Sequence, residues 1–396
     1  MWQKTKNLYH LGIALISNIL FRFPSRKLIV IGVTGTDGKT TTVSLIYHIL
    51  HTAGFNTSMV SSVGAIIGGK TYDIGFHVTT PSSFSLQRFL NKAVASGKVS
   101  KPNFMVLETT SHALDQYRVF GIKFAVGVLT NVTHEHLDYH KTYENYVRTK
   151  VKLLKLSKIA IVNRDDESYS LLNLKFKAQN PKLRTYGMGE NADINPKIFP
   201  FKTTLIGEFN KYNILAAISV CRALGVENRV IVEAIESFAP PKGRGDIVFK
   251  KDFTVMIDFA HTPNSIEQIL KSVRPIVKGK IIHVFGSAGL RDEAKRPIMG
   301  KNSSQYADVM ILTSEDPRSE SVDQINAQIE SGIVNKKVKI LKVSDRKKAI
   351  ENAIKMAKIG DFVLITGKSH EKSMNYGHGE IAWDEYSVTR EALRSK

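Results

Sequence analysis

Residues 29–50 read IVIGVTGTDGKTTTVSLIYHIL, and this stretch decides what kind of fold the chain can adopt. The β-branched run Ile29–Ile31 predicts a short buried strand, and apolar residues from Thr41 to Leu50 recur at helical spacing. The glycines between these two segments therefore lie at a turn from a strand into a helix. Such turns are typical of α/β folds, and they are a common place for phosphate groups to bind.

The glycine-rich turn has the chemistry of a phosphate-binding loop. Gly32, Gly35 and Gly38 let the main chain approach a ligand closely with its N–H groups pointing inward. Lys39 adds a cation, and the Thr40 hydroxyl can reach a Mg²⁺ ion. The spacing departs from the usual GxxxxGK pattern, because Gly32 stands one residue earlier than that pattern requires. We expect a nucleotide site here, and the alternative is an ordinary glycine-rich turn.

The composition is that of an ordinary soluble protein with two or three domains. The chain has 396 residues, of which 42% are hydrophobic, so it can bury substantial cores. Its formal net charge of +20 would permit contact with nucleic acid or an anionic membrane. The basic residues are dispersed and no nucleic-acid-binding motif accompanies them, so we expect small-molecule substrates and no nucleic acid. The single cysteine, Cys221, excludes an intramolecular disulfide and fits a cytoplasmic location.

Residues 1–26, before the glycine-rich turn, are predicted to be helical. The apolar run Leu11–Phe23 is only about half as long as a membrane-spanning helix needs to be, so no integral span is expected. No signal-peptide cleavage site follows it. We favour a helix packed on the first domain. The alternative is an interfacial helix in weak peripheral contact with anionic lipid, because basic residues flank it: Lys4, Lys6, Arg22, Arg26 and Lys27.

Strands and helices alternate through residues 27–240, which we expect to form one nucleotide-binding domain with a parallel sheet covered on both faces. Polar residues follow the predicted strands at Thr34–Thr40, Glu108–His112 and Thr130–Asp138, so they should converge at one edge of the sheet. Ser82 or Ser83 should cap a helix. The predicted strands are Thr57–Val60, Phe104–Leu107, Ala125–Leu129 and Ile159–Val162, and the predicted helices include Tyr143–Leu156 and Ile214–Leu224.

Pro240–Gly245 is the predicted domain boundary, because its prolines and glycines break regular structure. Beyond it, residues 241–396 should form a second, smaller doubly wound domain. Four charged loops each follow a predicted strand, which argues for one site at the strand ends. The strands are Thr254–Ile257, Lys280–Phe285, Val309–Leu312 and Phe362–Ile365, and the loops are DFAHTP from Asp258, GSAGLRDEAKR from Gly286, EDPR from Glu315 and GKSHE from Gly367.

Several polar residues of the first domain are candidates for chemistry, although each has a plainer alternative. Glu108 ends a strand and could complete a Mg²⁺ shell, or it could be a helix-capping acid. His136, in the cluster HEHLD, would need partners from elsewhere to hold a metal. Lys150 by itself indicates a solvated basic helix face. Asn210 and Asn213 offer amides that could bind a base edge, or they are simply good residues for a helix start.

Taken in order along the chain, these motifs resemble the ATP-dependent Mur ligases. The most similar branch is the UDP-N-acetylmuramoyl-tripeptide synthetases, which add the third amino acid to the peptidoglycan stem. The resemblance runs from about Lys27 to the end of the chain and implies a P-loop-type central domain followed by a Rossmann-like C-terminal domain. The motifs are GVTGTDGKTT, the TTP of Thr79–Pro81, Glu108 with SHAL, TNVTHEHLDYH, Lys150, GEFNKYN, DFAHTP, RDEAKRP, EDPR and GKSHE.

The resemblance implies an ATP-dependent acid–amino-acid ligase of peptidoglycan precursor synthesis that works through an acyl phosphate, with ATP and Mg²⁺ as cofactors. Lys39, His136 and Lys150 would be catalytic, and Lys150 would be carbamylated. Nucleotide would contact Gly35, Thr36, Asp37, Gly38, Lys39, Thr40, Thr41, Asn131, Asn210, Asn213, Arg244, Asp258 and His261. Metal would contact Thr40, Glu108, His136 and Lys150. The acceptor would contact Thr79, Thr80, Pro81, Ser111, His112 and Arg118, and the incoming amino acid Arg291, Asp316, Arg318, Gly367 and Glu371.

The chain departs from the family pattern in the loops that would bind the amino acid. Glu315 and Asp316 stand where the family usually has Asp and Asn, and Ser369 stands where it has Gly. Arg318 resembles the diaminopimelate-adding enzymes, in which it would meet the distal carboxylate while Glu371 takes the distal amine. The added negative charge at Asp316 should favour a cationic distal group, so both diaminopimelate and lysine remain candidates.

The stretch before the phosphate loop is short for this branch, in which a UDP-binding domain typically comes first. Either the acceptor is held without a uridine pocket or another chain supplies that pocket, and we expect weak affinity for UDP. We also expect a monomer. One alternative is a related ligase of the folylpolyglutamate or cyanophycin type, although DFAHTP, EDPR and GKSHE argue against folate. A second alternative is a nucleotide-binding partner without catalysis, against which Lys39, His136 and Lys150 argue.

Overall fold

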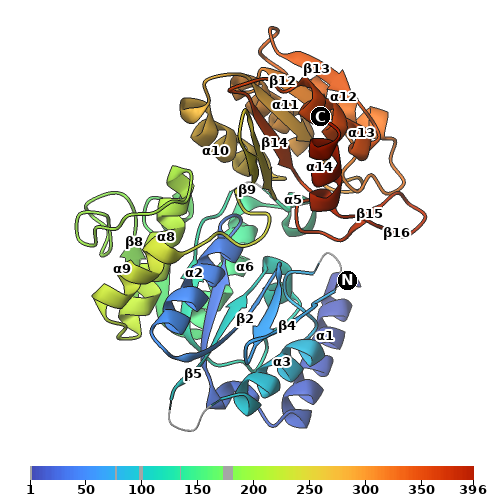
Figure 1. Ribbon diagram of the computed structural model, residues 1–396. Coiled ribbons are helices and arrows are strands. Elements are labelled where there is room, and N and C mark those ends of the chain that lie inside the picture. The colour runs from blue at the N-terminus through green and yellow to red at the C-terminus, as the bar shows by residue number, and fades with distance from the viewer. Residues whose placement is uncertain (1, 76–77, 98–100, 134, 173–181) are drawn as a thin grey trace. The chain divides into compact units, whose positions relative to one another are not determined.

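The computed structural model describes residues 2–75, 78–97, 101–133, 135–172 and 182–396. The chain divides into two compact units (Figure 1). The first contains Met1–Thr204 and Phe209–Ala239, and the second contains Leu205–Glu208 and Pro240–Lys396. Each unit is built on a sheet that is mostly parallel and is flanked by helices. The predicted α/β fold class, a parallel-sheet domain followed by a smaller α/β domain, is therefore confirmed.

The sheet of the first unit has the strand order β4-β3-β2-β5-β1-β6-β7-β8 within the described residues. The strands from β2 to β8 in that order pair in parallel, whereas β3 and β4 add an antiparallel edge. The bounds are β1 Ile29–Thr34, β2 Asn56–Ser61, β3 Gly64–Ile67, β4 Lys70–Tyr72, β5 Asn103–Glu108, β6 Phe124–Leu129, β7 Ser157–Asn163 and β8 Leu183–Tyr186.

The helices of the first unit lie on both faces of this sheet (Figure 1). One face carries the core formed by Val30, Met105 and Phe124 with side chains of α3 and α6. The other face is covered by α2, against which α9 packs. The helices are α1 Trp2–Leu20, η1 Pro24–Lys27, α2 Lys39–Thr52, α3 Ser83–Ala95, α4 Ser111–Asp115, α5 Leu137–His140, α6 Tyr143–Lys155, η2 Glu167–Tyr169, α8 Glu208–Ala223 and α9 Asn228–Ser237.

Local sequence signals account for most of these bounds. The side chain of Ser82 accepts the Ser85 N–H and caps α3, as one of the two predicted serines should. Thr110 and Thr142 cap α4 and α6 in the same way. The prediction for α8 was wrong at its start, because the helix begins at Glu208 rather than Ile214. Its first turns are polar, which hid them from a search for apolar periodicity.

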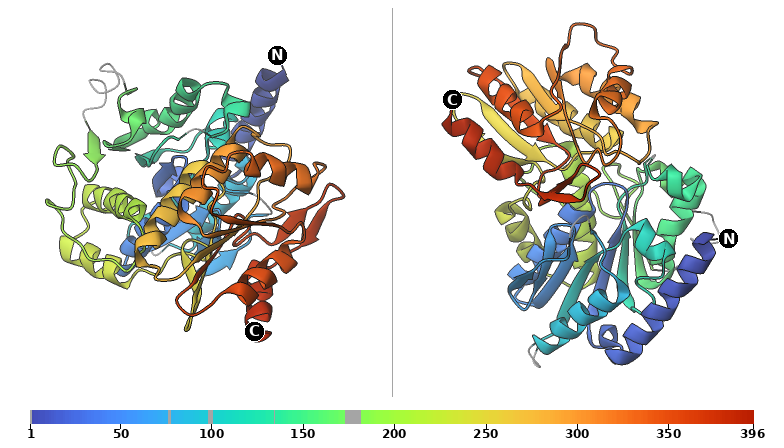
Figure 2. Two further views of the ribbon diagram at one scale, coloured as in Figure 1. Left: turned by 90° about the horizontal axis from the view of Figure 1, so that it is seen from above. Right: turned by 90° about the vertical axis from the view of Figure 1, so that its right-hand side faces the viewer.

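The sheet of the second unit has the order β13-β12-β11-β14-β10-β9, with β9 antiparallel at one edge. In this unit α13 packs on β11, β12 and β14 with α14 beside it, while α10, α11 and α12 pack against one another in sequence (Figure 2). The strands are β9 Asp246–Lys250, β10 Thr254–Asp258, β11 Ile281–Phe285, β12 Val309–Leu312, β13 Lys339–Lys342 and β14 Phe362–Thr366, with β15 Ser373–Asn375 and β16 Glu380–Ala382 as a separate hairpin. The helices are α10 Pro263–Val273, η3 Arg274–Ile276, α11 Lys295–Tyr306, α12 Val322–Glu330, α13 Arg346–Met356 and α14 Glu385–Arg394.

The amino-terminal helix α1 packs beside α3 in the first unit. Among the described residues, no helix is both long and apolar enough to cross a lipid bilayer.

A fully buried ion pair joins α13 and α14. Arg346 donates to Glu385 through Nε at 2.9 Å and through Nη2 at 2.5 Å. The remaining guanidinium hydrogens reach the carbonyls of Ser314 and Thr366, which follow β12 and end β14. The neighbouring charge Glu385 raises the pKa of Arg346, although burial opposes this shift. The pair therefore connects two helices to the ends of two strands.

Replacing Arg346 by Met should lower the free energy of unfolding by about 3–5 kcal/mol, because Glu385 would be left as a buried, unpaired charge. The measurement is chemical denaturation followed by a probe of the second unit. Lys347→Met is the matched control, since Lys347 pairs with Glu391 on the same two helices but both side chains are at least half exposed. The Arg346→Met, Glu385→Leu double variant should regain most of the loss. Equal losses in Arg346→Met and Lys347→Met would contradict this account.

Candidate active site

The phosphate loop lies where three parallel strands end together. In the register of the sheet, Val33 of β1 is opposite Glu108 of β5, and Thr34 is opposite Leu129 of β6. The glycine-rich turn, Glu108 and the segment after β6 are therefore at one edge, as the sequence predicted. Gly38 precedes α2 with a φ of +79°, and a Cβ added to it would lie 2.2 Å from Asn213 Oδ1. A side chain is excluded there by both conformation and space.

Glu108 and Thr40 form the centre of this edge. The Thr40 hydroxyl lies 3.1 and 3.0 Å from the two carboxylate oxygens of Glu108, and both residues are buried. Ser62, just beyond β2, lies 2.9 Å from the Thr40 hydroxyl, and its N–H donates to Glu108 Oε2 at 2.9 Å. A hydroxyl and a carboxylate held this way are suitable oxygen ligands for Mg²⁺, which proteins usually bind through one or two such groups together with substrate phosphates.

The segment after β6 fixes the conformation of the phosphate loop. Asn131 accepts the Asp37 N–H at 2.9 Å and donates to the Asp37 carbonyl at 3.2 Å. The Thr130 hydroxyl donates to the same carbonyl at 2.7 Å. Lys39 Nζ donates to the Thr36 carbonyl at 2.6 Å, so the lysine lies against its own loop. The loop is therefore preformed by side chains from a neighbouring strand end.

Lys150 of α6 is buried directly beneath this loop. Its Nζ donates to the Gly35 carbonyl at 2.6 Å and lies 4.3 Å from the centre of the Tyr146 ring. Among the described residues it forms no ion pair, and only 1% of its surface is exposed. Burial, together with the charge of Lys39, holds the pKa of Lys150 well below its ordinary value, although nearby carboxylates oppose this. The plain alternative of a solvated basic face is therefore wrong for this residue.

His136 lies in a group of aromatic side chains close to Lys150. Its ring is 5.0 Å from that of His112 and 6.2 Å from that of Tyr146, measured between centres. Desolvation by the surrounding protein lowers the pKa of His136 to about 4, although 38% of its side chain is exposed. The ring is therefore neutral at pH 7. A neutral imidazole is the form that binds metals. His134 of the same motif lies outside the described residues, as does His77, which precedes Thr79–Pro81.

The residues expected to contact the acceptor form a second group beside Glu108. The Thr80 hydroxyl donates to the Glu108 carbonyl at 2.9 Å, and Arg118 Nη1 donates to the Thr80 carbonyl at 2.9 Å. Burial lowers the pKa of Arg118. The Ser111 hydroxyl lies 3.0 Å from His140 Nε2. Segments distant in sequence are thus brought together around the carboxylate that ends β5.

In the second unit, one group gathers around Asp258 at the end of β10. Its carboxylate accepts the Gly245 N–H at 2.6 Å and the Ala260 N–H at 2.7 Å. Arg244 lies over the Phe259 ring at 4.5 Å, and His261 Nδ1 is 2.8 Å from the Phe259 carbonyl. Burial raises the pKa of Asp258, and the Arg244 charge opposes that shift. The three nucleotide-binding residues expected in this unit are therefore neighbours.

A charged group lies at the ends of β12 and β14. Lys368, fully buried, has its Nζ 2.9 Å from both carboxylate oxygens of Asp316 and 2.6 Å from Glu371 Oε2. Arg318 donates through Nη1 to the Gly289 carbonyl, and burial and the charge of Arg291 lower the pKa of Arg318. One cation thus faces two carboxylates, so Lys368 offsets the charge of Asp316 only in part.

Glu315 is a buried acid next to this charged group. Its Oε2 has no hydrogen-bond partner among the described residues, and a Cβ added to Gly367 would lie 2.2 Å from that atom. Burial raises the pKa of Glu315 to about 8, although Arg346 and Lys295 lower it. The Glu315 carboxyl is therefore protonated at pH 7.

Sequence reasoning missed three residues of these groups. Ser62 follows the end of β2, so the rule that polar residues after parallel strands gather at one edge could have found it. Tyr146 stands four residues before Lys150 on α6, and helical spacing could have found it. No sequence signal separates the buried Lys368 from the exposed lysines of this basic chain. Within the described residues, no three His, Cys, Asp or Glu side chains gather as a metal site.

Comparison with known proteins identifies the family to which this chain belongs. Residues 33–221 match the family described as the Mur ligase middle domain, and residues 243–369 match the Mur ligase, glutamate ligase domain. The UDP-N-acetylmuramoyl-L-alanyl-D-glutamate--2,6-diaminopimelate ligase of Aquifex aeolicus is 39% identical over 94% of this chain and 79% of its own length. The ligase of the same name from Geobacillus kaustophilus is 36% identical over 97% of this chain and 83% of its own length.

Solved structures agree with these relatives. A UDP-N-acetylmuramoyl-L-alanyl-D-glutamate--2,6-diaminopimelate ligase superposes with a TM-score of 0.61 at 28% identity, covering 93% of this chain and 78% of the other. A pseudomurein peptide ligase type C from Methanothermus fervidus, with a TM-score of 0.66 at 18% identity, covers 93% of this chain and 79% of its own and shows the shared fold alone.

A phosphate loop with a partner carboxylate, followed by a second α/β unit with charged strand-end loops, defines an ATP-dependent ligase that forms amide bonds. The chain belongs to the Mur ligase family, whose members of this kind act in peptidoglycan precursor synthesis.

The buried Glu315 should make stability fall as pH rises. The unfolded carboxyl ionises near its ordinary pKa of 4.5, whereas the folded one stays protonated until about 8. Between these values the folded state holds the extra proton, so stability is greatest at the lower end and is lost towards the higher one. Glu315→Gln removes this dependence. We expect the variant to gain stability relative to the unsubstituted protein as pH rises through this window. The difference in unfolding free energy should grow by up to about 1.4 kcal/mol per pH unit. Parallel pH profiles would contradict the assignment.

Proposed function

We propose that this chain adds 2,6-diaminopimelate to a muramoyl-dipeptide-type acceptor through an acyl phosphate, with ATP converted to ADP and phosphate. The observation that carries this proposal is that arginine and carboxylate side chains lie together at the ends of β12 and β14. Arg318, with the charge of Arg291 near it, can hold a distal carboxylate, while Glu371 can hold a distal ammonium group. Lysine lacks the distal carboxylate, so an arginine aimed at that group favours diaminopimelate.

The names of the most similar relatives support the same acceptor and amino acid. Relatives at 36–39% identity carry the name of the diaminopimelate-adding ligase. A bifunctional folylpolyglutamate synthase/dihydrofolate synthase is only 17% identical at a TM-score of 0.66, so it shares the fold and lends the folate alternative no further support. Whether the acceptor carries UDP is decided by assay, with UDP-linked and UDP-free muramoyl dipeptides side by side.

In the first step, the acceptor carboxylate attacks the γ-phosphorus of ATP, the bond to the β-phosphate oxygen breaks, and ADP leaves. Negative charge accumulates on the transferred group, so the contribution of the protein is mainly electrostatic. Lys39 and the main-chain N–H groups of the loop would hold the phosphates. Lys39 now lies against the Thr36 carbonyl at 2.6 Å and needs only side-chain rotation to reach a ligand in the loop.

Bound Mg²⁺ would neutralise charge on the phosphates and orient them. Thr40 and Glu108 fit such an ion, because an oxygen pair at 3.0–3.1 Å is already buried at the strand ends. The Ser62 N–H and the Thr80 hydroxyl hold Glu108 in position from two sides. His136, neutral at pH 7, would hold a second ion together with Lys150 in its carbamylated form.

The environment of Lys150 suits carbamylation. Carbon dioxide reacts with a neutral amine, and burial lowers the pKa of Lys150, which favours that neutral form. The amine nitrogen would bond to the carbon of CO₂ and release one proton to solvent, which converts the neutral amine into a carboxylate-like anion. That anion would be beside His136, where a metal would stabilise it.

In the second step, the amine of the incoming amino acid attacks the carbonyl carbon of the acyl phosphate, and inorganic phosphate leaves from a tetrahedral intermediate. Arg318 and Glu371 would fix the far end of the amino acid and so position its reacting amine. Lys368 would reduce the repulsion between the Asp316 and Glu371 carboxylates, since it contacts both.

Arg318→Ala should lower kcat/KM for diaminopimelate about 100-fold, because a charged contact to a carboxylate contributes about 1.5–3 kcal/mol. Activity with lysine should change little, so lysine serves as the internal control. The measurement is ADP release in the presence of muramoyl-dipeptide acceptor and each amino acid. Equal losses for both amino acids, or a preference of the unsubstituted protein for lysine, would overturn the choice of diaminopimelate. The absence of ADP release with any muramoyl acceptor would overturn the proposed function itself.

Lys150→Ala should lower kcat by about 10²–10³ or more, because it removes a group that holds charge at the reacting phosphate. Activity of the unsubstituted protein should fall in CO₂-depleted buffer and recover on addition of bicarbonate, whereas Lys150→Ala should be insensitive to bicarbonate. Lys152→Ala is the matched control on the same helix, since Lys152 is 42% exposed and paired with Asp115. A bicarbonate response that survives in Lys150→Ala would refute carbamylation at this lysine.

A further inference from the structure

Large apolar side chains of the amino-terminal helix α1 face solvent, whereas an ordinary surface helix turns its large apolar side chains inward. Six large apolar side chains on it are between 44% and 67% exposed, out of twenty such exposed side chains in the described residues. At 100° per residue they fall within an arc of about 140°. We call this arc the outer face of α1; it consists of Leu8, Tyr9, Leu15, Ile16, Ile19 and Leu20.

The opposite face of α1 packs on the first unit and combines buried polar residues with the fully buried Ala14. Asn18 is buried and donates to the Phe120 carbonyl at 2.8 Å, and it accepts from Gln87 at 3.2 Å. Ser17 is buried as well, and Asn7 donates to Asp115 at 3.1 Å. These hydrogen bonds fix the rotation of the helix. The outer face therefore cannot turn inward without leaving buried amides unpaired.

The apolar surface continues beyond the helix. Phe21 stacks edge-on against Phe84 of α3 at 5.2 Å between ring centres, and Phe84 is itself 45% exposed. Figure 1 shows α1 lying alongside α3. Gly12 stands within the arc, and a Cβ added there would meet no atom within 4 Å. A cluster of exposed apolar side chains of this kind marks an interaction surface.

Charge decides which partner fits this surface. Arg22, Arg26 and Lys27 follow the carboxyl end of the helix, and Lys6 is near its amino end. The whole chain carries a formal charge of +20, so a second copy of it would be repelled, whereas an anionic bilayer would be attracted. An apolar face combined with flanking basic residues is the pattern of helices that lie in the plane of a membrane interface.

We propose that the outer face of α1 binds the surface of an anionic lipid bilayer, with the helix lying in the interface and Arg22, Arg26 and Lys27 against the headgroups. The helix has 19 residues and would lie flat over about 28 Å at the ordinary rise of 1.5 Å per residue. The surface would bring the enzyme to a membrane.

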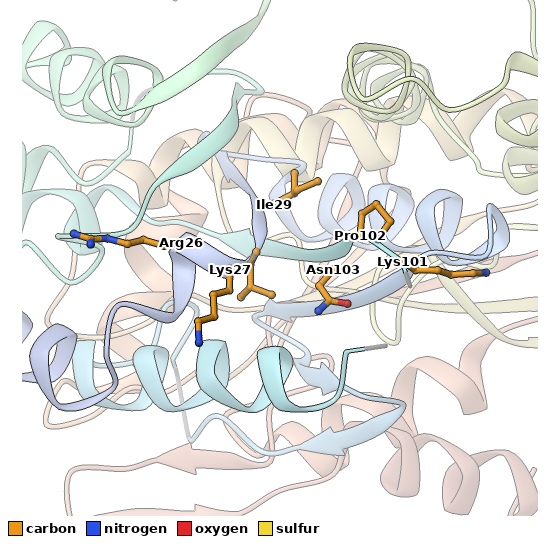
Figure 3. A pocket seen from close by; sticks show the side chains of 7 residues that line it. Arg26, Lys27, Ile29, Lys101, Pro102 and Asn103 are labelled. Carbon is orange, nitrogen blue, oxygen red and sulfur yellow. The ribbon is translucent and has the colours of Figure 1, made fainter. Parts of the chain in front are cut away.

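A nearby cavity of about 440 Å³ does not change this assignment. It is lined by Arg26, Lys27, Lys101 and Asn103 among others, at the edge of the sheet where β1 and β5 begin. Figure 3 shows that the charged ends of Arg26, Lys27 and Lys101 point in different directions rather than toward one centre. These three cations therefore do not form a site for a single bound anion.

The test uses the full chain and phosphatidylcholine vesicles with or without phosphatidylglycerol. The protein should co-sediment with the anionic vesicles, and binding should weaken as salt screens the headgroups. The double variant Ile16→Glu, Ile19→Glu should bind at least about tenfold more weakly. Gly12→Leu, which adds an apolar side chain in open space, should bind several-fold more tightly, with a gain of up to about tenfold. Ile359→Glu is the matched control, because Ile359 is a single exposed isoleucine of the second unit at 85% exposure.

ATP-dependent ligation in solution should be unchanged in all three variants, which shows that they fold. Failure of the unsubstituted protein to sediment with anionic vesicles would overturn the proposal. A concentration-dependent dimer in analytical ultracentrifugation would also overturn it, if the double substitution abolished that dimer and no vesicle binding was seen. Equal binding by the double variant and Ile359→Glu would also overturn it, since binding would then come from net charge alone. None of these outcomes bears on the ligase chemistry.

Discussion

The parallel register of β5, β1 and β6 is the constraint on which the site of the first unit depends. It sets Val33 opposite Glu108 and Thr34 opposite Leu129. The glycine-rich turn, the Glu108 carboxylate and the segment after β6 therefore lie together at one edge of the sheet. A shift of one residue in either pairing would move Glu108 away from the Thr40 hydroxyl that it now meets at 3.0–3.1 Å. The burial of nearly every residue of β1 on both faces makes such a shift very unfavourable.

Three buried basic side chains differ in the groups that surround them and so in how the cost of removing a positive charge from water is offset. Arg346 has a carboxylate and two main-chain carbonyls, and its role is to hold elements together. Lys368 has two carboxylates and keeps a charged group in order at the strand ends. Lys150 has a carbonyl and an aromatic ring, and its pKa falls accordingly. Burial and the charge of Lys39 shift Lys150 towards the uncharged amine, which agrees with the catalytic role proposed for it.

Much of the site in the first unit could be predicted because each residue follows a strand whose apolar run is plain in the sequence. Glu108 and Asn131 were found in this way, and both contact the loop as expected. Ser62 was missed although the same rule applies to it. The expected effect of Asp316 was different in kind. Its charge was evident from the sequence, but its ion pair with Lys368, fifty-two residues later, depends on how the strands are arranged in the sheet. Contacts between distant loops cannot be inferred from residue types alone.

The amino acid sequence by itself determined the alternation of strands and helices, the phosphate loop, the order of the family motifs and hence the class of reaction. These features are local, because apolar periodicity, glycine conformation and helix capping act within a few residues. The tertiary structure alone decided which lysines are buried and which way α1 faces. The sequence of α1 is compatible with either face turned inward, and hydrogen bonds from Asn18 and Asn7 to residues about a hundred positions away select the polar one. Burial is a property of the assembled chain, and it sets both the lowered pKa of Lys150 and the exposure of the apolar face of α1.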